Sequence, residues 1–261
     1  MTAAPAAERA EPVLRLRGIG RRFGGLDAVR NVDLEVTYGE RRAILGPNGA
    51  GKTTLFNVIS GDVRPTAGTI EFFGDEITTL PPRVRAKLGI GRTYQKSRLF
   101  LGMSVEDNLY VAILGVRRGH LRPVVLPGRD GALRERAREL AGTVGLDGRE
   151  SMLVGSLSHG EQRQLEVAMA RAVDPRLMLL DEPASGLSRG ERVALTDLLL
   201  TLDPSITLIL IEHDMDVALR VADRITMMNE GEVIVEGTPD EIRANQTVHD
   251  LYLGRGYHAD G

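Results

Sequence analysis

The chain of 261 residues contains no cysteine. Disulfide bonds, zinc–thiolate sites and iron–sulfur clusters are therefore excluded. The absence of cysteine also suits a reducing compartment. No run approaches the ~18 apolar residues that a transmembrane helix needs, and so we do not expect the chain to be embedded in a membrane.

The sequence also lacks a strong excess of charge of either sign. Its 33 Lys and Arg residues and 36 Asp and Glu residues give a formal net charge of −3. This balance gives no general reason to expect nucleic acid as a partner. Residues 1–12 are rich in alanine and proline and have no apolar core, and so we predict a flexible tail rather than a signal peptide.

Glycine, in contrast, is abundant, with 30 residues, and three glycines lie in one short stretch that ends in Lys-Thr. The stretch, residues 46–53, follows a predicted strand, 41–45, and its end overlaps the start of a predicted helix, 52–60. Glycines let backbone N–H groups point at phosphates, Lys52 can reach the β- and γ-phosphates, and the Thr53 hydroxyl can ligate Mg²⁺. The chain has only three lysines, so a chance match is rare. The candidate nucleotide-binding residues here are Gly46, Pro47, Asn48, Gly49, Ala50, Gly51, Lys52, Thr53 and Thr54.

A second group of candidate residues follows a continuous apolar run, 177–180. Residues 177–180 predict a buried strand that delivers Asp181 and Glu182 to its carboxyl end, where α/β folds bind ligands. Asp181 suits the shell of a bound Mg²⁺, and Glu182 suits the activation of water. Read alone, the stretch is also consistent with a strand that ends in solvated acids. Beside a phosphate-binding loop, the functional interpretation is favoured.

Between these motifs, residues 157–162 read Leu-Ser-His-Gly-Glu-Gln. Ser158 and Glu161 have the spacing of a capping box, and a well-capped helix is the simplest interpretation. However, the Ser158 hydroxyl and the Gly160 backbone N–H at an exposed helix start would also form an anion site. This second anion site is separated in sequence from the first.

The order of predicted elements indicates an α/β fold. Residues 13–94 and 157–254 are predicted to form a nucleotide-binding core. Residues 95–156 are predicted to form a mostly helical subdomain inserted into it, and residues 224–236 a terminal β-hairpin.

Taken together, these motifs resemble those of the ATP-binding-cassette (ABC) ATPases, and the resemblance covers nearly the whole chain. Residues 46–53 resemble the Walker A motif of that family, and residues 177–182 resemble its Walker B motif. Residues 157–162 resemble its LSGGQ signature, with His159 and Glu161 as departures. The resemblance implies a P-loop NTPase fold: a RecA-like core with a parallel or mixed sheet, an antiparallel N-terminal β-subdomain and an inserted α-helical subdomain.

The resemblance also implies roles for individual residues. Gln95 occupies the Q-loop position, His213 matches the switch histidine, and Phe23 stands where the family places an aromatic ring against adenine. Read alone, these residues would be a surface residue, a helix cap and a core side chain. The implied catalytic residues are Glu182, His213, Gln95 and Lys52. The implied ligands of Mg²⁺ are Thr53, Gln95 and, through water, Asp181.

The family architecture implies a head-to-tail pair of cassettes around two ATP molecules. Ser158 and Gly160 would then hold the γ-phosphate of the ATP that the other chain binds. The implied partners are a second ABC ATPase subunit, identical or not, transmembrane permease subunits that dock on the helical subdomain and, indirectly, a solute-binding protein. The implied place is peripheral, on the cytoplasmic side of the cell (inner) membrane. Ser188 ends the D-loop, 185–188, where the family usually has Asp, and so the contact across the dimer is expected to differ.

Within the family, the sequence resembles the ATPase subunits of branched-chain amino acid importers. The stretches that carry this resemblance are 23–26, 89–95, 211–215, 236–239 and 252–254. Importers of urea, short-chain amides or other amino acids stay open as alternatives, as does a soluble ABC ATPase that serves no transporter. Glu182 and His213 argue against a non-hydrolytic regulatory subunit. Residues 18–23 break the dehydrogenase pattern G-x-G-x-x-G at its last position, and no Asn-Lys-x-Asp motif of a GTPase is present.

Overall fold

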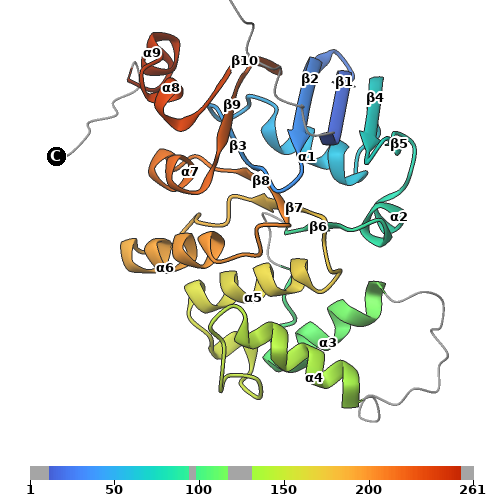
Figure 1. Cartoon of the computed structure of the whole chain (residues 1–261), viewed down its shortest axis with the longest axis vertical. Helices are drawn as coiled ribbons and strands as arrows, with labels where there is room; N and C mark the ends of the chain where they lie inside the picture. The colour runs from blue at the N-terminus through green and yellow to red at the C-terminus, as the bar shows by residue number, and fades with distance from the viewer. Residues whose placement is uncertain (1–11, 94–97, 117–130, 254–261) are drawn as a thin grey trace, which may run out of the picture.

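The computed structural model describes residues 12–93, 98–116 and 131–253, whose strands form two sheets (Figure 1). The first sheet is antiparallel and has the order β2-β1-β4-β5. Its strands are β1 (Pro12–Phe23), β2 (Leu26–Thr37), β4 (Ala67–Phe72) and β5 (Asp75–Glu76). β1 and β2 have 12 residues each and form a long antiparallel hairpin.

The second sheet has six strands in the order β10-β9-β3-β8-β7-β6. Their bounds are β3 (Arg41–Leu45), β6 (Ile90–Arg92), β7 (Leu177–Asp181), β8 (Thr207–Ile211), β9 (Arg224–Asn229) and β10 (Glu232–Gly237). Neighbours from β9 to β6 are parallel, and β10 runs antiparallel to β9. Parallel strands end at the same edge of a sheet. The loops that follow β3, β7 and β8 therefore meet there, and they carry the phosphate-binding loop, Glu182 and His213.

Helices cover both faces of the six-stranded sheet. Their bounds are α1 (Lys52–Ser60), α2 (Pro82–Lys87), α3 (Val105–Val116), α4 (Gly131–Gly142), α5 (His159–Arg171), α6 (Arg189–Leu200), α7 (Met215–Val221), α8 (Pro239–Arg243) and α9 (Gln246–Leu253). A short 3₁₀ helix spans Val154–Ser156. None of the helices in the described ranges is long and apolar enough to cross a bilayer.

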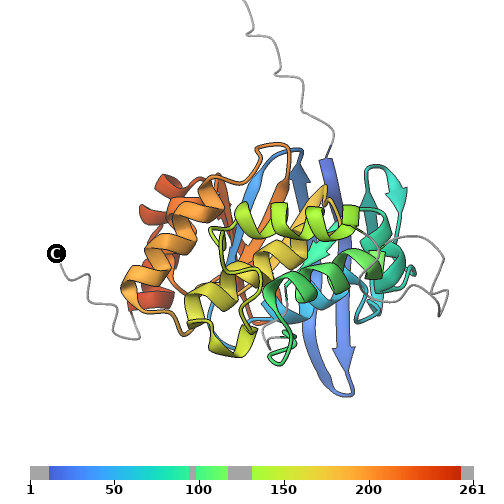
Figure 2. The same ribbon diagram turned by 90° about the horizontal axis from the view of Figure 1, so that it is seen from below.

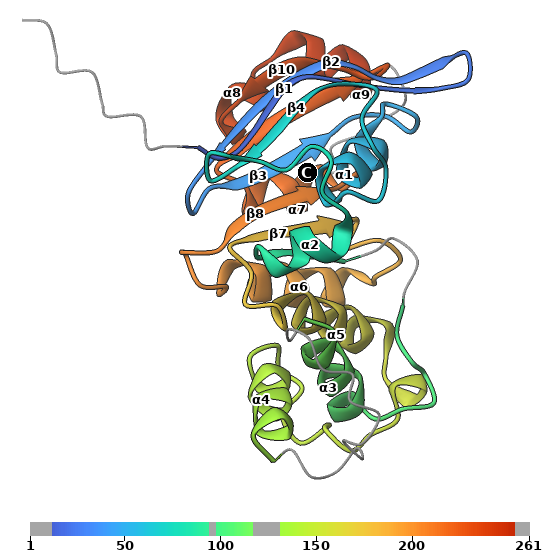
Figure 3. The ribbon, with the colours of Figure 1, turned by 90° about the vertical axis from the view of Figure 1, so that its right-hand side faces the viewer.

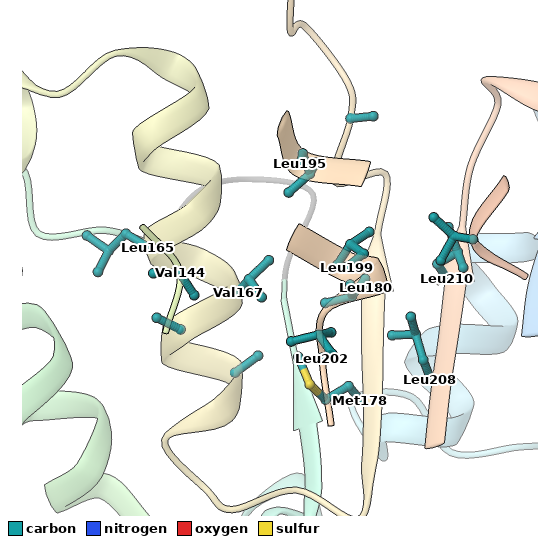
Figure 4. Packing of buried hydrophobic residues seen from close by; sticks show 14 of the residues in the cluster. Val144, Leu165, Val167, Met178, Leu180, Leu195, Leu199, Leu202, Leu208 and Leu210 are labelled. Atoms are coloured by element: carbon teal, nitrogen blue, oxygen red, sulfur yellow. The ribbon is translucent and has the colours of Figure 1, made fainter. Parts of the chain in front are cut away.

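Two buried clusters hold these layers together. One packs α1 between the antiparallel sheet and one face of the six-stranded sheet, through residues such as Phe56 and Leu179. The other joins the opposite face to α5 and α6, where Leu180 of β7 lies near Leu199 of α6 (Figure 4). β7 and β8 are buried along their whole length, as their continuous apolar runs predict.

α3 and α4 lie within the predicted segment 95–156, at the end of the molecule away from the β1–β2 hairpin (Figure 3). From below, they lie with α5 in front of the strands (Figure 2). Arg134 of α4 pairs with Glu106 and Asp107 of α3, which fixes the two helices to each other. α5 begins after this segment and packs against both helices.

The predicted strand 41–45, the helix 52–60 and the terminal hairpin are confirmed. β5, α2 and β6 were not predicted. They are only two, six and three residues long, too short for hydrophobic periodicity to reveal them.

Candidate functional site

The phosphate-binding loop joins β3 to α1, and two of its glycines have no room for a side chain. A Cβ on Gly46 would clash with the carbonyl oxygen of Met228, and one on Gly51 with that of Ala28. Gly51 also has a left-handed backbone, with φ +96°. It stands at the N-cap of α1, and because glycine has no side chain, no side-chain hydrogen bond caps the helix. The first turn of α1 therefore keeps its N–H groups for an anion.

Lys52 is the first residue of α1, and its side chain folds back over this loop. Its Nζ donates to the carbonyl oxygens of Gly46 (2.6 Å) and Pro47 (3.0 Å), and only 6% of the residue is exposed. Burial lowers the pKa of Lys52, and the charges of Glu182 and Asp181 oppose this effect. The ammonium group is thus held at the loop in a desolvated setting, where its attraction to a phosphate is strong.

An open cavity of about 630 Å³ lies over the loop, within the size range of small-molecule sites. Its lining residues are Phe23, Leu26, Asp27, Ala28, Arg30, Asn48, Gly49, Ala50, Gly51, Lys52, Thr53, Thr54, Glu182 and Glu230. Phe23 ends β1 and is 44% exposed. Arg21, which does not line the cavity, stacks its guanidinium 4.2 Å from the centroid of the Phe23 ring. An exposed ring in a cavity wall can stack on a nucleobase.

Asp181 ends β7 and is only 1% exposed. Its backbone N–H donates to the Thr93 hydroxyl (3.1 Å), and its Oδ2 lies 3.5 Å from Arg92. Burial raises the pKa of Asp181, whereas the Arg92 charge lowers it. Its Oδ1 is buried and has no hydrogen-bond partner among the described residues.

This orphaned oxygen of Asp181 fits the water shell of Mg²⁺, which is usually held by one or two carboxylates plus phosphate oxygens. Within the described ranges, no group of three or more His, Asp or Glu side chains could hold a metal by itself. A magnesium ion would therefore need further ligands from Thr53, water and the nucleotide.

Arg92, which sequence reasoning did not assign to the site, joins β6 to the phosphate-loop helix. Its guanidinium donates to Asn57 Oδ1 (2.7 Å), Ser60 Oγ (2.5 Å) and Asp62 Oδ2 (2.7 Å). Arg92 also contacts Asp181 at the end of β7. It therefore connects three elements: α1, β7 and its own strand β6, which ends three residues before Gln95. Its position just before Gln95 is the one signal that the sequence offers.

Glu182 and His213 follow neighbouring parallel strands and lie side by side. Glu182 Oε2 is 4.0 Å from His213 Nδ1, and the Glu182 N–H donates to the carbonyl oxygen of Ile211 (3.0 Å). Glu182 has φ +49°, which is uncommon for a residue other than glycine and is often found at functional sites. Glu182 lines the cavity beside Lys52, where a carboxylate can accept a proton from water.

Glu212 is a second residue that the sequence reasoning missed. It is fully buried, at 0% exposed, and its two oxygens accept the N–H groups of Ala184 (2.9 Å) and His213 (3.3 Å). Burial raises the pKa of Glu212 to about 7. The carboxylate links the turn after Glu182 to His213. The sequence does offer one signal for Glu212: it is an acidic residue directly after an apolar run, as Asp181 is.

The signature residues form a capped helix start, as predicted. Ser158 Oγ accepts the N–H of Glu161 (3.2 Å), and the Glu161 carboxylate accepts the N–H of Ser158 (2.8 Å). The Gly160 N–H, predicted to be a donor to phosphate, donates instead to Glu191 Oε1 (3.0 Å). Ser188 caps α6, in a capping box with Glu191. The second anion site is thus occupied by a carboxylate of the same chain.

The structure brings most of the predicted nucleotide-binding residues together and leaves the signature apart. Gly46 and Pro47 contact Lys52, whereas Ser158 and Gly160 do not line the cavity. Gln95 lies outside the described residues, so its role stays a prediction. The sequence did not predict the cavity residues of the β1–β2 hairpin and the β9–β10 turn, because their approach to the loop depends on the tertiary fold. These are Leu26, Asp27, Ala28, Arg30 and Glu230.

Comparisons with known proteins identify the family. A family model described as "ABC transporter" matches residues 29–185, and one described as "Branched-chain amino acid ATP-binding cassette transporter" matches residues 232–258. The high-affinity branched-chain amino acid transport ATP-binding protein LivG of Salmonella typhimurium (strain LT2) is 39% identical over 251 residues, which cover 94% of this chain and 98% of LivG.

Two solved structures are also similar. The ADP conformation of MJ1267, an ATP-binding cassette of an ABC transporter, has a TM-score of 0.84 at 27% identity over 94% of this chain and 100% of that chain. A dimeric post-hydrolysis state of the ATP-binding cassette MJ0796, bound to ADP and Pi, has a TM-score of 0.74 at 26% identity over 87% of this chain and 98% of that chain. The P-loop NTPase fold predicted from the sequence is therefore confirmed, and the chain belongs to the ATP-binding-cassette family of ABC transporters.

Proposed function

We propose that this chain is the ATP-hydrolysing subunit of an ABC importer and that it couples ATP binding and hydrolysis in a cassette dimer to uptake of branched-chain amino acids. The observation that carries the proposal is one cavity lined by both Lys52 and Glu182. An ammonium group that binds phosphate and a carboxylate that accepts a proton are the two groups that hydrolysis of a phosphoanhydride needs at close quarters.

In this proposal, each residue has a defined task. Lys52 and the N–H groups of the loop hold the β- and γ-phosphates, and the Phe23 ring stacks on adenine. Glu182 takes the proton of the attacking water, and His213 contacts the γ-phosphate from beside it. Mg²⁺, held by Thr53, Gln95 and, through water, Asp181, would neutralise charge on the phosphates.

A second cassette completes the site. Ser158 and Gly160 do not line the cavity, so a phosphate bound by Lys52 can meet a signature motif only if another chain supplies it. The dimeric structure of the similar cassette MJ0796 supports this arrangement. The further partners are transmembrane permease subunits and, indirectly, a solute-binding protein, with no nucleic acid. The chain then works peripherally at the cytoplasmic side of the inner membrane.

Support for the solute comes from the relatives. LivG is described as a high-affinity branched-chain amino acid transport ATP-binding protein, and the family model over residues 232–258 carries a similar description. No described residue of the cavity would contact the transported solute, so the assignment depends on similarity.

The Glu182→Gln variant tests the catalytic part of the proposal. The amide keeps the shape of the side chain but cannot accept the proton, and so we expect unchanged ATP affinity and turnover reduced by roughly 100-fold or more. ATP should then accumulate in a stable dimer, measured by size-exclusion chromatography with and without ATP. Normal turnover in this variant would rule out Glu182 as the base.

Reconstitution tests the transport part. The chain is placed in proteoliposomes with the permease subunits, sister cassette and binding protein of a branched-chain amino acid importer from the same organism, and ATP hydrolysis is measured with different solutes. We expect leucine to stimulate hydrolysis and urea or acetamide to have no effect. Stimulation by urea or acetamide would move the assignment to the amide importers. Co-purification with ribosomes alone would argue against transport.

A further inference from the structure

Three helices in the described part of the chain begin with the same capping device, and in one of the three the capping acid also accepts a backbone N–H from another helix. Ser158 with Glu161, Ser188 with Glu191 and Thr238 with Glu241 each form a complete capping box. Glu191 alone among the three acids also accepts a backbone N–H from a different helix, that of Gly160 in α5. The Glu191 carboxylate thus accepts hydrogen bonds from the Ser188 N–H (2.9 Å), the Ser188 hydroxyl (2.7 Å) and the Gly160 N–H (3.0 Å).

The contact between Glu191 and Gly160 is also a close steric fit. A Cβ built on Gly160 would lie 2.9 Å from Glu191 Cγ, 3.0 Å from its Oε1 and 3.3 Å from its Cβ. These are atoms along the whole side chain of Glu191, so a larger residue at position 160 would displace that side chain. Glycine at position 160 is therefore required for the approach of Glu191, independently of any nucleotide.

Glu191 is an anion where an anion is expected to bind. Its hydrogen bonds to the Ser188 hydroxyl, and then to the N–H groups of Ser188 and Gly160, lower the pKa of Glu191, and so the side chain is charged at neutral pH. A phosphate that accepts a hydrogen bond from the Gly160 N–H would compete for this donor with the Glu191 carboxylate. The two negatively charged groups would then lie within hydrogen-bonding distance of each other. A carboxylate and a phosphate cannot share one N–H without repulsion.

We propose that Glu191 competes with the γ-phosphate for the signature motif, and that its displacement from Gly160 sets the ATP concentration at which two cassettes close. This inference rests on the proposed function, because it takes Gly160 to be the donor that meets the phosphate held by the partner. When phosphate takes the Gly160 N–H, Glu191 keeps its two contacts with Ser188. The end of the D-loop is then uncoupled from α5, so that the arrival of nucleotide at the signature is transmitted to α6.

The test uses the full chain in the Glu182→Gln background, where ATP is not consumed. Glu191→Gln keeps the size of the side chain and removes the charge that opposes the phosphate. We expect the ATP concentration for half-maximal dimer formation, measured by sedimentation velocity, to fall by about threefold. Glu241→Gln is the matched control. It alters the same kind of capping box on α8, with no third donor, and should leave the dimerisation midpoint unchanged.

The outcomes separate this inference from the proposed function. If the Glu182→Gln parent stays monomeric at saturating ATP, both are overturned. If the parent dimerises but Glu191→Gln needs as much ATP or more, only the role of Glu191 is overturned. An equal shift of the midpoint in Glu241→Gln would also overturn the role of Glu191, because a weakened helix cap would then explain the shift.

A second measurement tests the contact without nucleotide. The cost of Gly160→Ala in unfolding free energy is measured by chemical denaturation in the wild-type chain and in the Glu191→Ala chain. We expect Gly160→Ala to destabilise the wild-type chain and to cost clearly less when Glu191 is absent, because the space beside position 160 is then open. Equal costs in the two chains would show that the two residues are not coupled, and would overturn the competition.

Discussion

The N-termini of α1 and α5 are both predicted to bind phosphate, yet they are built in opposite ways. At α1, the residue before the helix is Gly51, no side chain caps the helix and the first turn contains no acid. At α5, Ser158 and Glu161 form a complete capping box, and Glu191 occupies the next donor. The first helix start leaves its donors to a ligand, whereas the second satisfies them with its own chain.

This difference indicates that the two sites bind phosphate with different strengths. α1 adds the Lys52 ammonium to its uncapped N–H groups and opens on a cavity of about 630 Å³. At the start of α5, two carboxylates lie near the position of a phosphate, that of Glu161 in α5 and that of Glu191 in α6. A chain built in this way should bind nucleotide at α1 by itself. The N-terminus of α5 should bind a phosphate only when a second chain already holds that phosphate in place.

The largest effect should come from removing the cation at α1. Lys52→Ala should weaken ATP binding to the single chain by roughly 10- to 100-fold, because it removes hydrogen bonds to a charged group. Isothermal titration calorimetry with ATP measures the change. Lys87→Ala is the matched control, since Lys87 is exposed in the last turn of α2 and does not line the cavity. Equal affinities of the two variants would refute the importance of Lys52.

A smaller effect should appear in the pH dependence of stability, because the loops around α1 contain buried ionisable groups. Burial raises the pKa of Glu212 from 4.5 in the unfolded chain to about 7. The native state therefore keeps a proton that the unfolded state releases between pH 4.5 and 7. The wild-type unfolding free energy should fall as the pH rises through this window, by at most roughly 3 kcal/mol, and level off above it.

Comparison with Glu212→Gln isolates this contribution, because the amide does not titrate. The unfolding free energy of Glu212→Gln minus that of the wild type should increase from pH 5 to pH 7 and then stay constant, as measured in urea. Glu241→Gln is the control from an exposed helix cap, where hydrogen bonds to Thr238 lower the pKa of Glu241. Its difference from the wild type should change little above pH 5. A constant difference for Glu212→Gln across the range would contradict the shift.

The contrast between the two helix starts also shows what a sequence can reveal. The loop from Gly46 to Thr53 could be predicted because all its donors come from consecutive residues, and local spacing fixes their geometry. Asp181 and Glu182 could be predicted for the same reason, as acids at the end of a continuous apolar run. The capping box of Ser158 and Glu161 is equally local, and it forms as the sequence predicts.

The contacts that the sequence could not predict join residues that are distant along the chain. Glu191 reaches Gly160 across 31 positions, and Glu212 reaches Ala184 across 28. Each contact depends on how two helices or two strand ends pack, and spacing within one segment carries no information on that. Arg92 shows the same limit, because its acceptors lie on α1, just after α1 and on β7.

The smallest effect should come from removing the cap at α5. Ser158→Ala removes the acceptor for the Glu161 N–H and should lower the unfolding free energy by about 1 kcal/mol. Thr238→Ala removes the equivalent acceptor at α8 and should cost about as much. Both variants should bind ATP as single chains with wild-type affinity, and Ser158→Ala alone should weaken the ATP-dependent dimer in the Glu182→Gln background. If Ser158→Ala weakened ATP binding by the single chain as Lys52→Ala does, the two helix starts would serve one site in one chain, and the proposed division between the two cassettes would be wrong.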